Sequence, residues 1–551
     1  MKVRLDINPN NSSLFLGIGS NHDFTGCLVK DGRIIKAIEA ERINKLKHSL
    51  NASNPFSSVL KYLFKGNEAK VAALGTCDTL NPKYFYEYRD KIRLYNHHLC
   101  HAAAVYYTSP FRESAIFVAD GLGSVWNTKD GGYKYETYSY YSAKDLKISL
   151  LGKQYGKIDS SLDETHLHHI YIPNSLGLFY NYITKIIGFD FLDDGKTMGL
   201  SAYGDPQKFY DKFIDHFEFK SNGVLNNNFG KKEVEYFSKL IEDTVDKQKK
   251  FKLKADIAAS CQKVFEECYL YCLNYLFKKT GSKNLCLSGG IVLNSVANGK
   301  IREKTPFRNI HYFPACGDNS IAVGAAFLAY YESNSSKGSK PLIYYQTPFL
   351  GKVYSRNQIK QTLNKKGVKY IKPKNIYEEV AKLISEGKIV GWFQGGSEIG
   401  PRALGHRSIL ADPRNKKIKD VLNKKVKHRE FFRPFAPAIL MEYATNYFEY
   451  INSPSPYMLE VFPIKKSVQP KIPAVVHKDG SGRLQTVGWK NRSLYLLIKE
   501  FYKITSVPVI LNTSFNINKM PIIETPEDAI NCFLQTDIDI LAIENFLCKK
   551  I

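Results

Sequence analysis

The sequence lacks any long hydrophobic run. Its longest apolar stretches, such as Ile321–Tyr331, are far shorter than the ~18 residues that a membrane-spanning helix needs. The opening residues, Met1–Asp6, contain no apolar core of a secretion signal. The ten cysteines include no Cys-x-x-Cys pair, so the sequence carries neither a zinc ribbon nor a disulfide framework. These absences predict a protein without a membrane span, located in the reducing cytoplasm.

Acidic residues are scarce relative to basic ones. The 551 residues include 78 Lys and Arg against 53 Asp and Glu, a formal net charge of +25. Such an excess is typical of proteins that bind nucleic acid, anionic membranes or anionic small molecules. The lysines are spread along the chain without a basic tail, so a solvated surface explains the charge equally well. The sequence also shows no tandem repeat and no low-complexity tract.

Short apolar runs alternate with stretches of helical periodicity, which predicts an α/β fold. A shift to Ser, Asn, Gly and Lys at Glu332–Lys340 predicts a domain boundary near residue 345. Asp31-Gly32 between apolar runs predicts a tight hairpin. The predicted strands include Leu14–Gly19, Val71–Gly75, Ala115–Ala119, Asn284–Leu287, Lys388–Phe393, Val507–Leu511 and Ile538–Ile543, and the predicted helices include Asn96–Tyr107, Ile257–Phe277, Ile376–Glu386 and Thr525–Phe533.

A histidine pair with two aspartates forms the first candidate site. His97 and His101 are four residues apart, so on a helix both imidazoles lie on one face. Asp120 follows a predicted strand, and Asp318 lies on a glycine turn before a small-residue helix. Two histidines with carboxylates suit iron, manganese or zinc, and argue against magnesium or calcium. On spacing alone, polar helix residues or satisfied core histidines are the alternative interpretation.

Two glycine-rich segments form the second and third candidates. Ser288-Gly289-Gly290 follows a strand and leads into a helix near Asn294, a context in which backbone N–H groups can approach a phosphate. The segment matches neither a P-loop nor a dinucleotide-binding fingerprint, and a plain turn explains it equally well. Asp194–Gly204, which includes Lys196 and Gly199, predicts a loop able to hold an oxyanion or a hydroxylated ligand, with an ordinary surface loop as the alternative.

Arginines among Gly, Pro and aromatic residues form the fourth candidate. Arg402 lies in Gly400–Ser408, Arg433 in Phe432–Pro437 and Arg483 after Asp479-Gly480-Ser481-Gly482, with Lys427 upstream of Arg433. Arginine presents a planar fork of donors that matches phosphate. The pattern predicts a pocket for a polyanion.

These motifs together resemble the NodU/CmcH-type O-carbamoyltransferases, which modify nodulation factors and antibiotics. The resemblance runs from about Leu16 to Phe546, nearly the whole chain. It rests on six segments in family order, namely His97–Ala102, Gly195–Leu200, Ser288–Asn294, Gly400–Ser408, Phe432–Pro437 and Asn512–Asn516.

The resemblance implies two domains and a two-step reaction. Residues 1–345 would form an ASKHA-type domain of duplicated ribonuclease-H-like lobes, and residues 346–551 a YrdC-like α/β domain. The C-terminal domain would form carbamoyl-adenylate from carbamoyl phosphate and ATP, with Mg as the partner of ATP, and release pyrophosphate. The N-terminal domain would transfer the carbamoyl group to a hydroxyl of a sugar or natural product and release AMP.

The resemblance also implies roles for the candidate residues, which are listed here by role. The metal ligands would be His97, His101, Asp120 and Asp318, with iron as the family's metal; the nucleotide site would include Lys196, Gly199, Ser288, Gly289, Gly290 and Asn294; the carbamoyl-phosphate site would be Lys427, Arg433 and Arg483, with Arg402 nearby. His22 matches the family's N-terminal histidine and would be the base for the acceptor hydroxyl, with a capping or structural role as the alternative. The chain departs from the family at Lys519-Met520, where Gly-Glu is usual, which puts one phosphate contact in doubt.

Two other functions compete with this interpretation. A tRNA threonylcarbamoyl-type enzyme would explain the net charge, but the arginine cluster and the fused C-terminal unit argue against a nucleic-acid substrate. A non-catalytic nucleotide-binding factor on the same fold is the second, because a fold does not fix function. No motif identifies the acceptor or the oligomeric state. The Tyr- and His-rich segment Thr137–Tyr171 is a candidate for lining the acceptor pocket.

Overall fold

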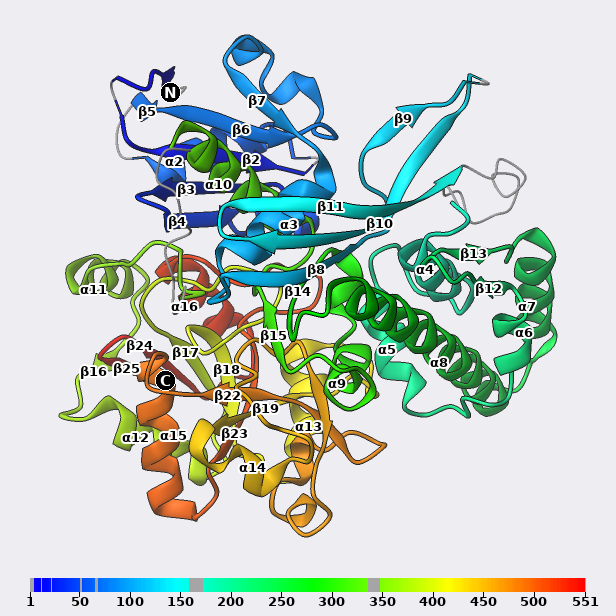
Figure 1. The fold of residues 1–551 in the computed structure, drawn as a ribbon. Helices are drawn as coiled ribbons and strands as arrows, with labels where there is room; N and C mark the ends of the chain where they lie inside the picture. Colours follow the sequence, from blue (N-terminus) through cyan, green and yellow to red (C-terminus); the bar gives the residue numbers. More distant parts are fainter. Residues whose placement is uncertain are drawn as a thin grey trace. The chain divides into compact units, whose positions relative to one another are not determined.

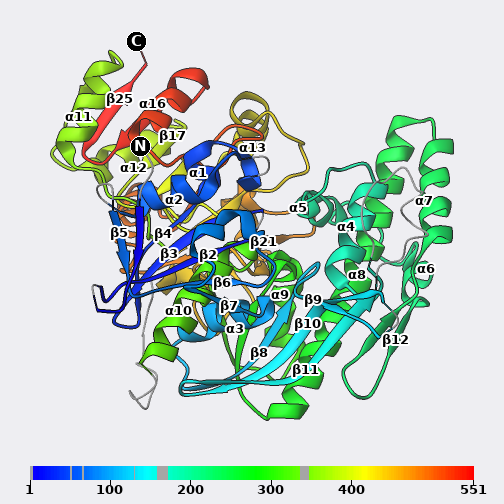
Figure 2. The same cartoon turned by 90° about the horizontal axis from the view of Figure 1, so that it is seen from above.

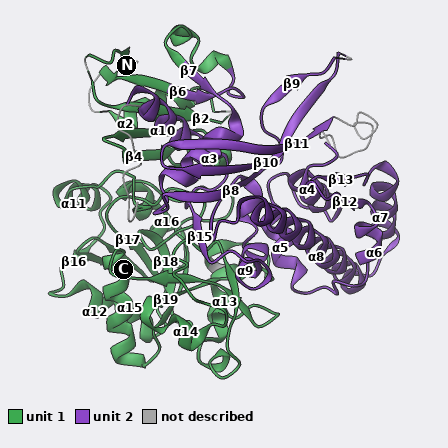
Figure 3. Ribbon diagram, viewed as in Figure 1, with its two compact units in different colours: residues 1–74, 82–92, 346–551 green, residues 75–81, 93–345 purple. Residues whose placement is uncertain are grey.

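A computed structural model describes residues 4–10, 12–20, 22–49, 52–64, 68–129, 131–157, 172–334 and 347–550. The chain divides into two compact units (Figure 3). Unit 1 contains residues 1–74, 82–92 and 346–551, and unit 2 contains residues 75–81 and 93–345. The chain therefore passes between the units close to the boundary predicted near residue 345, and again in the segment 74–93. The functional division into domains 1–345 and 346–551 stays a prediction.

Unit 2 is built on a mixed sheet with the order β11-β10-β8-β14-β15, and β9 pairs with β10 (Figure 1). Strand β8 is almost entirely buried and pairs in parallel with β14, as expected for central strands covered on both faces. The elements of this unit are α3 (His97–Tyr107), β8 (Glu113–Ala119), β9 (Val125–Asn127), β10 (Tyr133–Lys144), β11 (Lys147–Lys157), α4 (Leu176–Ile186), α5 (Asp194–Ser201), α6 (Tyr210–Ile214), β12 (Phe217–Phe219), β13 (Leu225–Asn227), α7 (Lys231–Asp243), α8 (Lys247–Thr280), β14 (Asn284–Ser288), α9 (Ser295–Lys304), β15 (Asn309–Tyr312) and α10 (Ile321–Ser333).

Helix α8 organises the helical part of unit 2. It begins after Asp246, whose side chain accepts the backbone N–H of Lys249, and it ends at Gly281 in the left-handed conformation. Helices α4, α5, α6, α7 and α9 all pack against it, and Figure 1 shows them gathered along its length. Helix α3 packs on α10 and on strands β8 and β14. This packing places the start of α3 beside the ends of the central strands.

Unit 1 contains an eight-stranded sheet with the order β16-β25-β24-β17-β18-β23-β19-β22. Strands β2, β3 and β4 belong to a separate sheet, where Asp31 and Gly32, both with positive φ, close the predicted hairpin. The strands of unit 1 are β1 (Arg4–Ile7), β2 (Phe15–Gly19), β3 (Thr25–Lys30), β4 (Arg33–Glu39), β5 (Glu68–Val71), β16 (Tyr370–Ile371), β17 (Val390–Phe393), β18 (Arg407–Ala411), β19 (Ala436–Leu440), β20 (Val461–Pro463), β21 (Ser481–Arg483), β22 (Gln485–Val487), β23 (Val509–Ser514), β24 (Ile540–Ile543) and β25 (Phe546–Lys549), while β6 (Ala73–Cys77) and β7 (Ile92–Tyr95) contain the passages between the units.

The helices of unit 1 follow sequence signals at their starts. Helix α16 begins at Pro526, and Thr525 with Asp528 forms a reciprocal capping box. Helices α12 and α15 pack on each other, and α15 also packs on β19 and β23 around a core that includes the fully buried Trp392. The helices are α1 (Ala40–Asn44), α2 (Pro55–Leu63), α11 (Arg356–Lys365), α12 (Ile376–Ser385), α13 (Ile418–Val421), α14 (Ala444–Tyr447), α15 (Arg492–Thr505) and α16 (Pro526–Gln535), and Figure 2 shows α1 and α2 beside β3 and β4.

The mixed α/β class predicted from the sequence is confirmed by these sheets and helices. All ten cysteines are buried free thiols, as the lack of paired spacing predicts. Among the described residues, no helix combines the length and the apolar character needed to cross a bilayer.

Candidate active site

Helix α3 of unit 2 carries both predicted histidine ligands. His97 and His101 are one turn apart and buried. Nε2 of His101 lies 3.1 Å from Oδ2 of Asp120 and 3.6 Å from Oδ1 of Asp318. Nε2 of His97 lies 3.7 Å and 3.6 Å from the same two oxygens. One ligand atom from each of the four residues lies within 4.8 Å of the others, so the fold brings all four predicted ligands together.

Hydroxyl groups hold the two imidazoles in this orientation. Nδ1 of His97 lies 3.0 Å from Oγ1 of Thr79. Nδ1 of His101 lies 3.2 Å from Oγ of Ser288 and 2.9 Å from Oγ of Ser320. Partners of this kind fix which ring nitrogen faces a metal. Ser288, predicted to bind nucleotide, is fully buried and contacts a predicted metal ligand.

The electrostatics of the four-residue group suit a divalent cation. Burial alone would lower the pKa of His97, but Asp318 and Asp120 raise it well above its usual value. The pKa of His101 is raised in the same way, against burial, by Asp120 and Asp318. The buried Nε2 of His97 makes no hydrogen bond to any described residue. A bound cation would replace the protons that the imidazoles hold here, and two carboxylates would balance its charge.

The glycines after β14 allow the chain to pass close to this group. Gly289 has a φ of 101°, and a Cβ there would lie 2.1 Å from the carbonyl oxygen of Ala119. A Cβ on Gly290 would lie 2.8 Å from Oδ1 of Asp120. Asn294 caps helix α9 by accepting a backbone N–H. The structure thus gives these residues packing and capping contacts, and their binding of nucleotide stays a prediction.

The segment predicted as a loop at Asp194–Gly204 is largely helical, so that prediction was wrong. Helix α5 occupies Asp194–Ser201 because its buried face packs against α8. Lys196 lies in its first turn, where Nζ is 2.7 Å from Oδ2 of Asp193 and 5.5 Å from the ring centre of Phe189. Gly199 lies inside the same helix. Tertiary packing outweighs the glycine content here.

A second set of predicted residues forms a group of positive charges in unit 1. We call Arg402, Lys427, Arg429, Arg433 and Arg483 the cationic cluster. Lys427 is buried, and its Nζ bonds to the backbone and side-chain oxygens of Ser514 and Asn516 at the end of β23. Arg429 lies in the same arginine-rich pattern of the sequence but was not predicted as a carbamoyl-phosphate ligand. It joins the cluster through its position between Lys427 and Arg433, and its guanidinium lies 4.5 Å from the ring centre of Phe435.

The members of the cationic cluster disfavour one another's charge. Burial, with Arg402, Arg429 and Arg433 nearby, lowers the pKa of Arg483 well below its usual value. Burial and Arg433 lower the pKa of Arg429 to about 9, and burial with Arg429 and Arg433 lowers that of Lys427. The one ion pair of Arg433 among described residues is with Glu430, at 3.6 Å. Neighbouring cations that lower one another's pKa values in this way form an environment that a bound polyanion stabilises.

Arg407 has a different role, although it lies in the same motif as Arg402. It is fully buried, and its guanidinium donates to the carbonyl oxygens of Gln394 at 2.7 Å, Gly395 at 3.1 Å and Glu524 at 3.3 Å. The guanidinium also lies 3.5 Å from the ring centre of Phe393. These contacts satisfy its donors within the protein, so Arg407 is structural.

His22 belongs to a third group in unit 1. Nδ1 of His22 is 3.4 Å from Oδ2 of Asp23, and Nδ1 of His48 is 2.7 Å from Oδ1 of Asp23. The backbone N–H of His48 donates to Glu41 at 2.8 Å. Asp23 and His48 both have φ values in the left-handed region, at 54° and 58°. His48 and Glu41 could not be predicted as members of this group, because no spacing pattern links them to His22.

Glu41 in this group predicts a pH-dependent stability. Burial, together with Glu39 and Asp23, raises the pKa of Glu41 from 4.5 to about 7. The folded state then holds the proton more tightly than the unfolded state, so stability falls as pH rises from about 4.5 to about 7. We expect Glu41→Gln to leave the free energy of unfolding nearly unchanged at pH 4.5 and to raise it by about 1–3 kcal/mol at pH 8.

Urea unfolding of the wild type and of the Glu41→Gln variant at both pH values measures this difference. Glu242→Gln on the exposed side of α7 is the matched control and should show no such dependence. An equal effect of Glu41→Gln at the two pH values would contradict the assignment.

The segment suggested as an acceptor pocket is partly core. Tyr138, Tyr140 and Tyr141 on β10 are buried, and the hydroxyls of Tyr138 and Tyr140 donate to the carbonyl oxygen of Gly223 at 3.2 and 2.8 Å. These tyrosines are therefore packing residues. The histidines at 166, 168 and 169 lie outside the described residues.

Comparison with known proteins identifies the family. Residues 61–327 match the family described as Carbamoyltransferase N-terminus, and residues 381–550 match Carbamoyltransferase C-terminus. The chain belongs to the carbamoyltransferase family, which confirms the resemblance seen in the sequence, and it is a carbamoyltransferase enzyme.

Individual relatives include nodulation proteins. The chain is 33% identical to nodulation protein NolNO of Sinorhizobium fredii, over 96% of this chain and 79% of that protein. It is 33% identical to nodulation protein NolO of Bradyrhizobium diazoefficiens, over 83% of this chain and 79% of that protein. A crystal structure of full-length HypF in its phosphate- and nucleotide-bound form overlaps 62% of this chain and 48% of HypF, at 14% identity and a TM-score of 0.40, which is too low to support an argument.

Proposed function

We propose that this carbamoyltransferase uses ATP and acts on a hydroxyl group of a sugar or natural product. In the first step, water releases phosphate from carbamoyl phosphate to give carbamate, and a carbamate oxygen attacks the α-phosphate of ATP to give carbamoyl-adenylate and pyrophosphate. In the second step, the acceptor oxygen attacks the carbamoyl carbon, and AMP leaves. The observation that carries the proposal is the cationic cluster, in which burial and the neighbouring basic side chains lower the pKa values of Lys427, Arg429 and Arg483.

The cationic cluster suits a small phosphorylated substrate. Arg433 and Arg483 present planar donor forks, which match the oxygens of a phosphate dianion. Lys427 is bonded to Ser514 and Asn516, so its amino group is held in place without the freedom of a surface lysine. Lys519, where the family usually has glycine, keeps a φ of 63°, so the backbone of that turn holds a conformation that glycine adopts readily.

The group of His97, His101, Asp120 and Asp318 would hold a divalent cation, and the resemblance favours iron over manganese or zinc. A cation there would stabilise negative charge on the nucleotide phosphate as AMP departs. The contribution of this chain is to hold the imidazoles in a fixed orientation, through Thr79, Ser288 and Ser320.

The base for the acceptor hydroxyl comes from the group around Asp23. The carboxylate of Asp23 accepts from Nδ1 of His48 at 2.7 Å, which leaves Nε2 of His48 as the basic nitrogen. His22 lies at a longer distance, 3.4 Å, from the same carboxylate. These hydrogen bonds, against burial, lower the pKa of Asp23, so it stays ionised. Both histidines are candidates, and His48 has the better geometry.

Substitution of each histidine separates these candidates. We expect His48→Asn to slow carbamoyl transfer by roughly 10²–10⁴-fold. His22→Asn should have the smaller effect if His48 is the base. Formation of carbamoyl-adenylate should persist in both variants. Transfer within about threefold of wild type in both variants would remove this group from the reaction.

An isotope-exchange assay tests the activation step without any acceptor. The protein with ATP and Mg should incorporate labelled pyrophosphate into ATP only when carbamoyl phosphate is present. Exchange that does not depend on carbamoyl phosphate, or no exchange at all, would contradict the proposed first step.

A further inference from the structure

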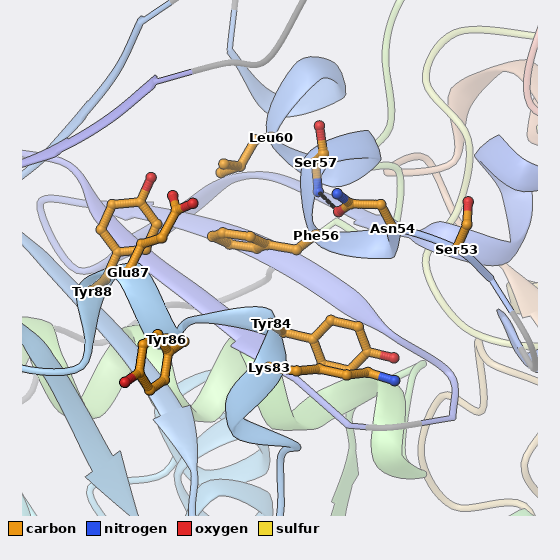
Figure 4. Close-up of a pocket in the computed structure, with 10 residues that line it drawn as sticks. All are labelled: Ser53, Asn54, Phe56, Ser57, Leu60, Lys83, Tyr84, Tyr86, Glu87 and Tyr88. Carbon is orange, nitrogen blue, oxygen red and sulfur yellow. Dashed lines mark hydrogen bonds between the residues drawn. The ribbon is translucent and has the colours of Figure 1, made fainter.

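A pocket of about 440 Å³ lies in unit 1 between the start of helix α2 and the segment Lys83–Tyr88 (Figure 4). Figure 4 shows the ring of Phe56 above those of Tyr84 and Tyr86, with Tyr88 and Glu87 at one side. The remaining lining residues are Ser53, Asn54, Ser57, Leu60 and Lys83. A volume of this size is typical of small-molecule sites.

The chemistry of the pocket differs from that of the cationic cluster. Aromatic rings dominate its lining, and its two charged residues, Lys83 and Glu87, have opposite signs. Serine, asparagine and tyrosine supply neutral hydrogen-bonding groups at its edges. A polyanion finds only one cation here, so the lining does not fit a phosphorylated ligand. Flat apolar rings edged by neutral polar groups match a hydroxylated ring, which has C–H bonds on its faces and hydroxyls at its rim.

The aromatic rings of the pocket are held before any ligand binds. Tyr86 is 64% exposed, yet Nη1 of Arg89 donates to its hydroxyl at 3.0 Å, and the guanidinium lies 5.0 Å from its ring centre. The rings of Tyr88 and Phe56 pack edge to face at 6.2 Å. Exposed tyrosines fixed in this way lose little conformational freedom when they bind a ligand.

Both walls of the pocket begin beside the group of His22, Asp23 and His48. The ring of Tyr84 packs edge to face on Phe24 at 5.3 Å, and Phe24 directly follows Asp23 in the chain. On the other wall, Ala52 precedes the lining residue Ser53 in the chain. The backbone N–H of Ala52 donates to the carbonyl of Ser49, which follows His48. One ring contact and one backbone hydrogen bond therefore connect the pocket walls to the chain neighbours of Asp23 and His48.

We propose that this pocket binds a neutral, polyhydroxylated ring of the acceptor and presents its hydroxyl toward the Asp23 group. This inference rests on the proposed function, because it assigns the acceptor site of the same reaction. It names the substrate class as an uncharged saccharide, and it makes Tyr84 and Tyr86 binding residues.

Direct binding of saccharides tests the proposal without catalysis. Saturation-transfer NMR would be recorded on the full chain with maltotriose, cellotriose and mannotriose, and with adenosine as a planar aromatic competitor. We expect at least one trisaccharide to bind, with about fivefold or more loss of affinity in Tyr86→Ala and near-wild-type binding in Tyr86→Phe. Tyr133→Ala removes a 56% exposed tyrosine on β10 and should not change binding. Thermal melts would show that Tyr86→Ala stays folded, because its side chain is mostly exposed.

The outcomes separate this proposal from the proposed function. No binding of any of the three saccharides, equal binding by wild type and Tyr86→Ala, or preferential binding of adenosine would each overturn the saccharide pocket. Carbamoyl-phosphate-dependent pyrophosphate exchange needs no acceptor, so its measurement on the wild type tests the activation step separately. If the wild-type protein shows no exchange, the proposed activation step is rejected. The NMR result still decides whether the pocket binds a saccharide.

Discussion

Replacing His101 by alanine will abolish carbamoyl transfer and leave carbamoyl-phosphate-dependent pyrophosphate exchange intact. His101 has the shortest carboxylate contact in the four-residue group, 3.1 Å to Asp120, and two serines orient its ring. Loss of one of four ligands should weaken metal binding by more than the roughly 10–100-fold that loss of an outer partner costs. Exchange should survive because the cationic cluster belongs to the other compact unit.

Metal content and the two activities are measured on the same preparation. His98→Asn is the matched control on the same helix, because His98 is buried but its Nδ1 lies 2.8 Å from Ser139 and it is not one of the four ligands. That variant should keep its metal. Equal loss of exchange and transfer in a folded His101→Ala protein would contradict the assignment of the two steps to separate sites.

Replacing Arg483 by methionine will nearly abolish the use of carbamoyl phosphate without destabilising the free protein. Arg483 is half-buried near Arg402, Arg429 and Arg433, and its buried Nε makes no hydrogen bond to any described residue. Removing a cation from this environment relieves repulsion and burial cost, so the melting temperature without ligand should stay the same or rise. Carbamoyl-adenylate formation should fall about 10²-fold or more, because a phosphate dianion loses a paired donor.

Arg407→Met is the matched control for this experiment. Arg407 is fully buried and donates to several backbone carbonyls, so its loss leaves them unsatisfied at about 1–3 kcal/mol each. That variant should melt at a clearly lower temperature. Two results would contradict the anion-binding role of the cluster. One is a large fall in the melting temperature of the Arg483→Met protein, and the other is carbamoyl-adenylate formation by this variant at the wild-type rate. Melting temperature and adenylate formation can be compared in the same way for Arg433→Lys. This variant keeps the positive charge but loses the paired donors that match a phosphate.

The sequence was sufficient to predict those site residues whose positions follow from the local geometry of a helix or a strand. The spacing of His97 and His101 required only a helix, and strands β8 and β14 were recognisable as buried apolar runs, so their ends could be located. The glycine-rich segment at Asp194 was misjudged because packing of α5 against α8 overrides weak helix propensity. Residues joined only by tertiary structure, such as His48 with Asp23, or Tyr84 with Phe24, have no sequence signature.

The structure also changes the interpretation of several motif residues. Ser288 supports His101, and Arg407 holds backbone carbonyls, although both lie in the motifs that carry the family resemblance. Tyrosines 138, 140 and 141 are core residues of β10. Residue type alone does not tell whether a tyrosine packs in the core or lines a pocket. That depends on whether other elements of the fold cover the face of the strand or turn on which it lies.

The central claim is that the enzyme activates the carbamoyl group as an adenylate before transfer. Incubation with ATP, Mg and ¹³C-labelled carbamoyl phosphate in the absence of an acceptor, followed by mass spectrometry, tests it directly. The account predicts ¹³C-labelled carbamoyl-adenylate together with pyrophosphate. Formation of ADP in place of pyrophosphate, or transfer of the ¹³C label to an acceptor without consumption of ATP, would contradict it.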